Sequence, residues 1–484
     1  MRTYIVAMAI SLIVSVLLTP YIRDFAIRRG WIDEPVGGRK IHKNPIPRVG
    51  GIAILIAMSC PLFGMYLWDN NISVEFREDI PLLTSLVFGS LIIGTIGILD
   101  DLFNIRALFK LGAQVAAALV VYFSGIQIEA INIPFLSLTV FPEWLSLLAT
   151  VFWITLVINA INLIDGMDGL AGSVVVLAGL SLFIMSLLEE NTLACLLLIS
   201  LVGATIGFLV FNLNPASVFL GDTGSMFLGF VLALTAVHSS QKSYTLFSMV
   251  GAIMVLGLPI FDLSMAILRR FLAGKHIFSA DQYHIHHILL RKGFSQKQSV
   301  LVLFVAALAL ESLAFMSIYA DDRLAAIAIL ALVPIGFVAV RFLGYTNIIS
   351  TVRRGKMFEQ VEKKADLRLE TASRFKKELV YLEREQILVR LSELAQELDW
   401  YRFEISCDGD ILHEWPRRRD KEHLQNVVKF QMDCEDGTCF VIWQLSETQV
   451  FSSYDRALNT LVVTMIEPYL RKIPYSVSRS VAVD

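Results

Sequence analysis

The sequence predicts an all-α polytopic membrane protein with about eleven transmembrane helices and a small cytoplasmic α+β domain at its C-terminus. Composition is the first reason: 55% of the 484 residues are hydrophobic, 18% are charged, and the mean hydropathy is +0.63. Average proteins have about 25% charged residues. The second reason is a series of long apolar segments that ends near residue 343, where a charged, helix-forming stretch follows.

A membrane span needs about 20 apolar residues. Such segments lie near residues 4–22, 49–68, 81–99, 107–124, 144–161, 170–188, 192–213, 224–240, 244–268, 298–318 and 323–343. The first segment has no basic leader and no clear small-residue cleavage site. It is therefore expected to be a retained span and not a cleaved signal peptide.

The distribution of lysine and arginine predicts the orientation. The loops after odd-numbered spans are the basic ones, and they hold Arg23, Arg28, Arg29, Arg39, Lys40, Lys43, Arg48, Arg106, Arg269, Arg270, Lys275, Arg291, Lys292 and Lys297. Odd-numbered spans are thus expected to end in the cytoplasm, with the N-terminus outside and the tail inside. The net charge of −3 gives no reason to expect a nucleic-acid partner.

The chain changes character at about Gly344. Residues 356–398 are rich in Glu, Lys, Arg, Leu and Ala and contain no Pro or Gly, which predicts one long helix or two. The stretches "YRFEISCDG", "NVVKFQMDC" and "CFVIWQLS" have strand patterns, and a last amphipathic helix is expected over 453–472. We therefore expect a membrane domain over 1–345, a helical linker over 346–400 and a regulatory α+β domain over 401–484.

Polar residues gather in five stretches that all fall on the predicted cytoplasmic side. They are "RKIHKNPIPRVGG", "GILDDLFNIR", "NAINLIDGMDG", "FNLNPASVFLGDTGS" and "FSADQYHIHHILLRKG". Converging carboxylates repel one another unless cations neutralise them, and oxygen ligands suit a hard cation such as Mg²⁺ or Mn²⁺. Magnesium usually completes its shell with water and phosphate oxygens. These stretches therefore predict a metal-assisted phosphate site where cytosol meets lipid, with one substrate from each side.

Simpler roles compete with this interpretation. Asp165 or Asp168 could cap the helix that follows them, and Asp222 could cap the next span. One cap needs only one acid, so the adjacent pair Asp100 and Asp101 favours function more strongly.

The histidines and basic residues have alternatives of their own. His284, His286 and His287 could bind zinc, but adjacent histidines point apart on a helix and no third soft ligand is near. Phosphate and donor binding is therefore the preferred interpretation. Positive-inside anchoring explains most basic residues, and a functional role is expected for His42, Lys43 and Arg48.

The same stretches carry a resemblance. "HKNPIPRVGG", "LDDLFNIRALFKLGAQ", "NAINLIDGMDGLAG", "FNLNPASVFLGDTGS" and "PIFDLSMAILRR…DQYHIHHILLRKGFS" resemble, in order, the motifs of the polyprenyl-phosphate N-acetylhexosamine-1-phosphate transferases, glycosyltransferase family 4. The resemblance covers about residues 1–345. It implies that a lipid phosphate attacks the β-phosphorus of a UDP-sugar, with Mg²⁺ on the pyrophosphate, and that UMP and a polyprenyl-diphospho-sugar are formed.

The resemblance also implies roles for individual residues. Its catalytic set comprises Asp100, Asp101, Asp222, His284, His286 and His287. Its substrate-binding set comprises Lys43, Arg48, Asn159, Asn162, Asp165 and Asp168, with Asp168 near the uracil. Its metal set comprises Asp222, Asp101 and Asn162, with Asp222 as the expected Mg²⁺ ligand. One of Asp100 and Asp101 would act as a base or bind the lipid phosphate, and the other would lie near the metal.

The histidine loop bears on the substrate. "DQYHIHHILLRKG" resembles the branch that uses UDP-N-acetylglucosamine, with undecaprenyl phosphate as the acceptor in a bacterial plasma membrane. A deoxy sugar such as N-acetylfucosamine stays open, whereas a muramoyl-pentapeptide donor fits less well because three consecutive histidines are missing. The tail departs from the family; its end is faintly similar to a GAF-type sensor domain, and its helical stalk is a candidate for homodimerisation.

Two other classes of protein share some of these features. Ion-coupled transporters also carry intramembrane carboxylates, but they hold them near the bilayer midplane, whereas these clusters share one face. A membrane-anchored sensor would leave five polar motifs unexplained. The transferase is therefore the preferred interpretation.

Overall fold

The structure is a computed structural model in which the chain divides into two units, Met1–Ile348 and Ile349–Asp484. It describes residues 1–32, 46–131, 139–242, 248–272 and 284–319, single positions between 274 and 394, and four strands between 400 and 445. Lys43, nearly all of the expected span 323–343, most of the linker and the expected helix 453–472 lie outside the described residues.

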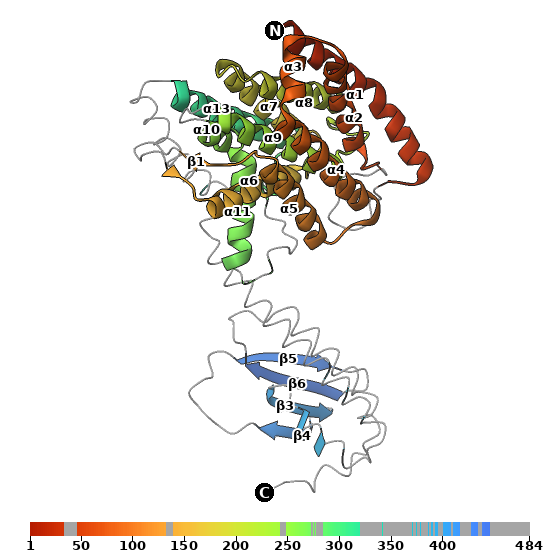
Figure 1. Cartoon of the computed structure of the whole chain (residues 1–484). Coiled ribbons are helices and arrows are strands. Elements are labelled where there is room, and N and C mark those ends of the chain that lie inside the picture. The colour runs from red at the N-terminus through yellow and green to blue at the C-terminus, as the bar shows by residue number, and fades with distance from the viewer. Residues whose placement is uncertain are drawn as a thin grey trace. The chain divides into compact units, whose positions relative to one another are not determined.

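The first unit is a bundle of helices (Figure 1). Within the described residues, eight helices are long and apolar enough to cross a membrane. They are α1 (Arg2–Arg29), α2 (Gly50–Leu67), α4 (Ile80–Phe103), α6 (Glu143–Ile164), α7 (Leu170–Leu188), α8 (Thr192–Asn212), α9 (Gly221–Lys242) and α13 (Gln296–Tyr319). These confirm a polytopic, mainly helical membrane protein. A further expected span forms the shorter apolar helix α5 (Ala107–Phe123).

The expected span over 244–268 differs in the structure. It is interrupted at Leu256, which separates α10 (Ser248–Val255) from α11 (Gly257–Leu272). Pro259 explains the interruption, because proline has no N–H to donate to the carbonyl four residues earlier and its ring clashes there. Hydropathy alone does not register this effect.

Several short elements were not predicted from the sequence. They are α3 (Asn71–Glu78), α12 (Ile285–Arg291) and the antiparallel pair β1 (Ala130–Ile131) and β2 (Thr139–Val140). Helix α3 begins with a capping box between Asn70 and Ser73, a local signal that a search for apolar spans does not use. Helix α12 lies within the histidine loop.

Helix α9 forms the centre of the bundle. In its apolar window 94% of the residues are buried, against 22% in α1. Neighbouring helices approach it through glycines: a side chain at Gly51 of α2 would overlap Gly224, and one at Gly97 of α4 would overlap Thr223. Glycine is required at such approaches because any Cβ would collide with backbone. This packing fixes the start of α9, which carries Asp222.

The second unit contains a four-stranded antiparallel sheet in the order β4-β3-β6-β5. Its strands are β3 (Trp400–Cys407), β4 (Asp410–Pro416), β5 (Val427–Asp433) and β6 (Thr438–Leu445). Three of them coincide with the expected strands. The fourth, β4, is not among the strands that the sequence predicts; it pairs with β3 directly after the stretch "CDGD".

Candidate active site

Three ionisable side chains meet where α4 ends and α9 begins. Asp100 lies in the last turn of α4, Lys110 in the first turn of α5 and Asp222 in the first turn of α9. The Lys110 ammonium donates to the Asp222 carboxylate at 2.7 Å and to the Asp100 carboxylate at 3.3 Å. These side chains are only 12–24% exposed, so water screens them weakly. One lysine thus holds two carboxylates together.

Asp101 uses both carboxylate oxygens to hold the start of α9. Its Oδ1 accepts from the Asp222 backbone N–H at 2.7 Å, and its Oδ2 accepts from the Thr223 N–H at 3.1 Å and hydroxyl at 2.6 Å. The first N–H groups of a helix have no partner within it, and a carboxylate there also suits the helix dipole. Asp101 therefore positions Asp222, and its direct role as base or metal ligand stays a prediction.

Helix α6 contributes amides at two levels. Asn162 donates to the Ser225 hydroxyl at 2.8 Å, which sets it against the first turn of α9. Asn159, one turn earlier, exchanges hydrogen bonds of 2.6 and 3.5 Å with Gln114 of α5. These bonds give Asn159 a structural role between helices, and its predicted role in substrate binding stays a prediction.

Asp165 lies in the loop between α6 and α7, close to the other acids. Burial, followed by the negative charges of Asp222 and Asp101, raises the pKa of Asp165 well above its ordinary range, and Arg48 acts in the opposite sense. The acids gathered at this end of the bundle are Asp100, Asp101, Asp165, Asp168 and Asp222. Such a concentration of carboxylates favours the binding of a cation.

The segment that carries Arg48 runs beside the segment that leads into α9. Backbone hydrogen bonds of 2.8–3.0 Å join residues 47, 50 and 51 to residues 219 and 220. Gly221 has a φ of 72°, and a side chain there would overlap the Arg48 carbonyl. The stretches "IPRVGG" and "FLGDTGS" therefore meet at the site. The sequence predicts both stretches on the same side of the membrane, and this contact agrees with that prediction.

Asp168 closes the loop before α7. Its Oδ2 accepts from the Asn214 amide at 2.9 Å and from the Ala216 N–H at 3.1 Å. Asn214 also donates to the Gln296 side-chain oxygen at 2.7 Å. The loop before α7, the loop before α9 and the start of α13 are thereby tied together.

Asp262 of α11 holds the start of the histidine helix α12. It is buried, its Oδ1 accepts from the Ile285 N–H at 3.1 Å, and its Oδ2 lies 3.4 Å from His284 Nδ1. Asp262 belongs to the quoted stretch "PIFDLSMAILRR", but none of the predicted site sets includes it. The contact fixes His284 at the N-terminus of α12.

His286 connects α12 to the acidic loop. Its ring packs against Gly166, where any side chain would overlap it. Burial, and then the neighbouring His287, lower the pKa of His286 to about 3. Near neutral pH it is therefore an uncharged hydrogen-bonding group beside Gly166 and not a cation.

The oxygen-rich groups at this site suit a hard divalent cation. Asp222, Asp100 and Asn162 supply carboxylate and amide oxygens, which Mg²⁺ prefers. Among the described residues, no three His, Cys, Asp or Glu side chains form a group that could hold a metal ion. Magnesium commonly takes only one or two protein carboxylates and fills its shell with water and phosphate oxygens. The residues thus fit a metal shared between protein and substrate.

Sequence reasoning undervalued several residues of this site. Sequence reasoning gives no individual role to Lys110, because membrane anchoring explains most basic residues, and it gives none to Gln114, Asp262 or Gln296. One signal could have found Lys110: it lies nine residues after Asp101 across a turn at Asn104, which has a positive φ. That turn folds α5 back beside α4 and brings the ammonium to the acids.

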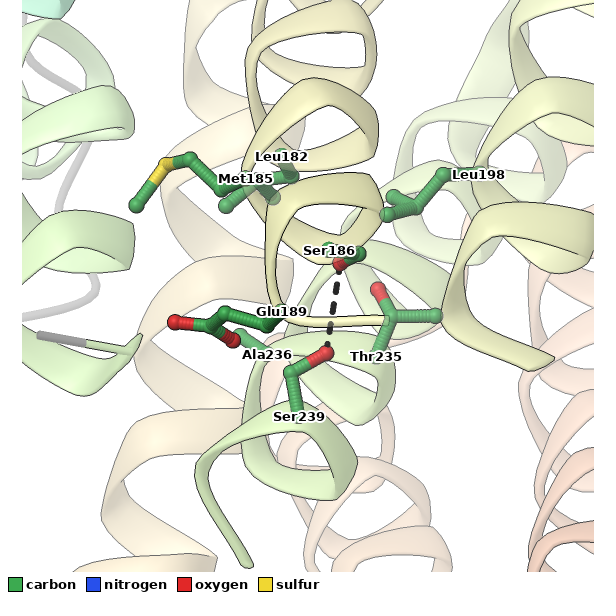
Figure 2. A pocket seen from close by; sticks show the side chains of 8 residues that line it. All are labelled: Leu182, Met185, Ser186, Glu189, Leu198, Thr235, Ala236 and Ser239. Carbon is green, nitrogen blue, oxygen red and sulfur yellow. Dashed lines mark hydrogen bonds between the residues drawn. The ribbon is translucent and has the colours of Figure 1, made fainter. Parts of the chain in front are cut away.

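A hollow at the opposite end of the same helices is separate from this site. Figure 2 shows its lining, in which Ser186 of α7 faces Ser239 of α9 at 3.5 Å. These residues lie at the C-terminal ends of α7 and α9, whereas Asp168 and Asp222 lie at their N-terminal ends. The hollow therefore has no part in the chemistry of the acids.

Comparisons with known proteins agree with this geometry. Residues 83–240 match the profile of glycosyl transferase family 4, a range that includes the five acids and Lys110. The chain is 37% identical over 301 residues to the probable undecaprenyl-phosphate N-acetylglucosaminyl 1-phosphate transferase of Bacillus subtilis, covering 62% of this chain and 81% of that protein.

Two other relatives carry similar names. The decaprenyl-phosphate N-acetylglucosaminephosphotransferase of Mycobacterium tuberculosis is 30% identical over 71% of this chain and 88% of its own length. The undecaprenyl-phosphate alpha-N-acetylglucosaminyl 1-phosphate transferase of Escherichia coli K12 is 27% identical over 62% of this chain and 80% of its own length. The similarity thus extends well beyond the short motifs.

Proposed function

Because the chain belongs to glycosyl transferase family 4, we propose that it transfers N-acetylglucosamine 1-phosphate from UDP-N-acetylglucosamine to undecaprenyl phosphate and releases UMP. The observation that carries the proposal is the convergence of Asp100, Lys110 and Asp222 at one end of an apolar bundle. In the proposed topology, these cation-binding and phosphate-binding groups would lie where water and lipid meet. The names of the three relatives support the sugar and the class of lipid.

The chemistry needs charge placement more than covalent help. An oxygen of the lipid phosphate attacks the β-phosphorus, the bond from that phosphorus to the oxygen bridging the α-phosphate breaks, and UMP leaves with that oxygen. A phosphate monoester, with its second pKa near 6, is largely ionised at neutral pH, so little deprotonation is required. Positioning and neutralisation of phosphate charge do most of the work in such transfers.

Individual residues then take distinct roles. Lys110 is placed to neutralise an incoming phosphate when it exchanges one of its carboxylate partners for a phosphate oxygen. Asp100 or Asp101 would act on the lipid phosphate, and Asp101 also keeps Asp222 in place. Neutral His286 beside Gly166 would donate a hydrogen bond to the donor.

Magnesium is part of the proposal. Asp222 would hold it together with the Asn162 oxygen and one acid of the Asp100–Asp101 pair, and bound Mg²⁺ would neutralise charge on the pyrophosphate. The raised pKa of Asp165 supports a site that gains from a cation. Mn²⁺ would satisfy the same oxygen ligands.

The finer architecture also belongs to the proposal. We propose eleven spans, a cytoplasmic active site, an N-terminus outside a bacterial plasma membrane, and an α+β tail. The sheet of β3 to β6 supports the last of these, and the basic loops of the sequence support the orientation. The tail would regulate the enzyme or dock a partner, and its stalk would serve a homodimer.

The test uses membranes that contain the protein, with undecaprenyl phosphate, Mg²⁺ and a panel of UDP-sugars, and separates the nucleotide products. UMP release with UDP-N-acetylglucosamine that is lost in Asp222→Asn supports the proposal. UMP release only with a deoxy-sugar or muramoyl donor would keep the reaction and change the sugar. UDP release would contradict the reaction.

A further inference from the structure

We propose that Gln296, acting through Asn214, is a positioning residue that fixes Asp168 for binding of the nucleotide. The inference rests on the proposed function and on the place near the uracil that the family resemblance implies for Asp168. Gln296 belongs to none of the predicted site sets. It is the first residue of α13 and lies 82 residues from Asn214 along the chain.

The hydrogen bonds leave one oxygen of Asp168 for a ligand. Both donors to this carboxylate, the Asn214 amide and the Ala216 N–H, bind Oδ2 at 2.9 and 3.1 Å. Within the described part of the chain, Oδ1 receives no hydrogen bond. A carboxylate held through one oxygen loses its rotational freedom before the ligand arrives, which lowers the entropy cost of binding.

Gln296 supports the Asn214 amide in the orientation that the Asp168 carboxylate requires. The Asn214 nitrogen donates to Asp168 Oδ2 at 2.9 Å and to Gln296 Oε1 at 2.7 Å. An Asn214 amide turned by 180° would present its oxygen to the Asp168 carboxylate, which can only accept, and would be repelled by it. The hydrogen bond to Gln296 therefore anchors the amide in that orientation and keeps its nitrogen within reach of Asp168.

The same helix carries a second attachment deeper in the bundle. Ser181 of α7 donates to the buried Glu311 of α13. Ser181 lies 13 residues beyond Asp168, and Glu311 lies 15 residues beyond Gln296. At about 1.5 Å per residue both are roughly 20 Å along their helices, so α7 and α13 are joined at two matching heights. This arrangement keeps Gln296 level with Asp168.

Gln296 is not needed to begin its helix. That task belongs to Ser295 and Gln298, which form reciprocal bonds: the Ser295 N–H donates to Gln298 Oε1 at 2.8 Å, and the Gln298 N–H donates to Ser295 Oγ at 3.3 Å. Gln298 therefore offers a matched control. It is the same residue type, it lies two residues after Gln296, and its side-chain bond within the described part of the chain goes only to Ser295 in the same turn.

The test compares purified full-length wild type with Gln296→Met and Gln298→Met. Loss of one neutral hydrogen bond predicts that Gln296→Met raises KM for the UDP-sugar about fivefold, while kcat and KM for undecaprenyl phosphate stay within about twofold. Gln298→Met should lower the melting temperature and leave KM unchanged. A Gln296→Met enzyme with wild-type KM would overturn the inference, as would equal rises in KM in both variants.

Direct binding of UMP separates this inference from the proposed function. Calorimetry should show about fivefold weaker UMP binding in Gln296→Met, for the same reason, even if no donor of the panel is turned over. Unchanged UMP binding would overturn the positioning role while turnover by the wild type still supports the transferase. If Gln296→Met does not fold, Gln296→Ala, which suits a helix, replaces it.

Discussion

The Lys110 ammonium lies 2.7 Å from the Asp222 carboxylate, although 112 residues separate them in the sequence. This ion pair joins the start of α5 to the start of α9, and a second contact of 3.3 Å adds Asp100 at the end of α4. Three helices thus present one cation and two anions at the same place. A metal ion could replace the Lys110 ammonium beside the two carboxylates, and a phosphate could replace the carboxylates beside Lys110.

The ion pair predicts non-additive effects on stability. Lys110→Met leaves two adjacent carboxylates without their shared cation, so it should lower the free energy of unfolding. In an Asp222→Asn background the same change should cost less, with a coupling energy of about 1–3 kcal/mol. Unfolding in detergent, followed by tryptophan fluorescence for all four proteins of the cycle, measures this coupling. Strict additivity would contradict the pairing.

Asp101 should behave as a helix cap. Asp101→Ala removes three hydrogen bonds from the start of α9 and should cost about 1–2 kcal/mol of stability. Asp101→Asn keeps one acceptor oxygen and should lose less. The melting temperatures of the two variants provide the comparison. If both variants are as stable as wild type but inactive, Asp101 acts on substrate or metal and the capping role is secondary.

Magnesium should stabilise the folded protein before any substrate is added. A ligand at 100 times its Kd contributes about 2.7 kcal/mol, so the melting temperature of wild type should rise with Mg²⁺ concentration. Asp222→Asn should remove most of that rise, whereas Gln298→Met, which lies outside the acidic group, should keep it. An equal rise in Asp222→Asn would place the metal elsewhere.

His286 predicts a loss of stability in acid. Its pKa in the folded chain is about 3, against an ordinary 6.5, so the unfolded chain binds the proton more readily. Its contribution to stability is complete above pH 6.5 and declines as the pH falls from 6.5 toward 3. Melting temperatures would be measured between about pH 5 and pH 8. As the pH falls over this range, the melting temperature of His286→Asn should decrease less steeply than that of wild type.

His287→Asn is the matched control for that experiment. Burial is the larger cause of the low pKa of His286 and His287 the smaller one, so this variant should keep most of the acid slope. Wild-type steepness in His286→Asn would show that other groups cause the acid sensitivity.

Much of the membrane part could be predicted because apolar length has a direct physical meaning in a bilayer. The lengths of the apolar segments locate the C-terminal ends of α4 and α6 and the N-terminal end of α9. They therefore also predict that Asp100, Asn162 and Asp222 lie at the same end of the bundle. The interruption at Leu256 could not be read from hydropathy, since it depends on a missing N–H at Pro259.

The partners of individual residues depend on packing, which the sequence pattern does not reveal. In the sequence, Lys110 cannot be distinguished from a lysine that anchors a membrane span. The turn at Asn104 brings it to Asp222, and this contact is evident only in the structure. Asp262 and Gln296 bind groups 23 and 82 residues away. Asp101 shows the opposite case. Its motif predicts a chemical role, and the structure adds a role as the cap of α9. Capping rules consider only residues close in sequence to the helix, so they could not predict this role.

The fate of the β-phosphate tests the proposed function most directly. Purified protein would be given undecaprenyl phosphate, Mg²⁺ and UDP-N-acetylglucosamine labelled with ³²P at the β-phosphorus. Transfer of sugar 1-phosphate predicts that the label moves into the lipid fraction, that unlabelled UMP appears, and that neither occurs in Asp222→Asn. Label that remains in the nucleotide as UDP would show transfer of the sugar alone and would contradict the proposed reaction.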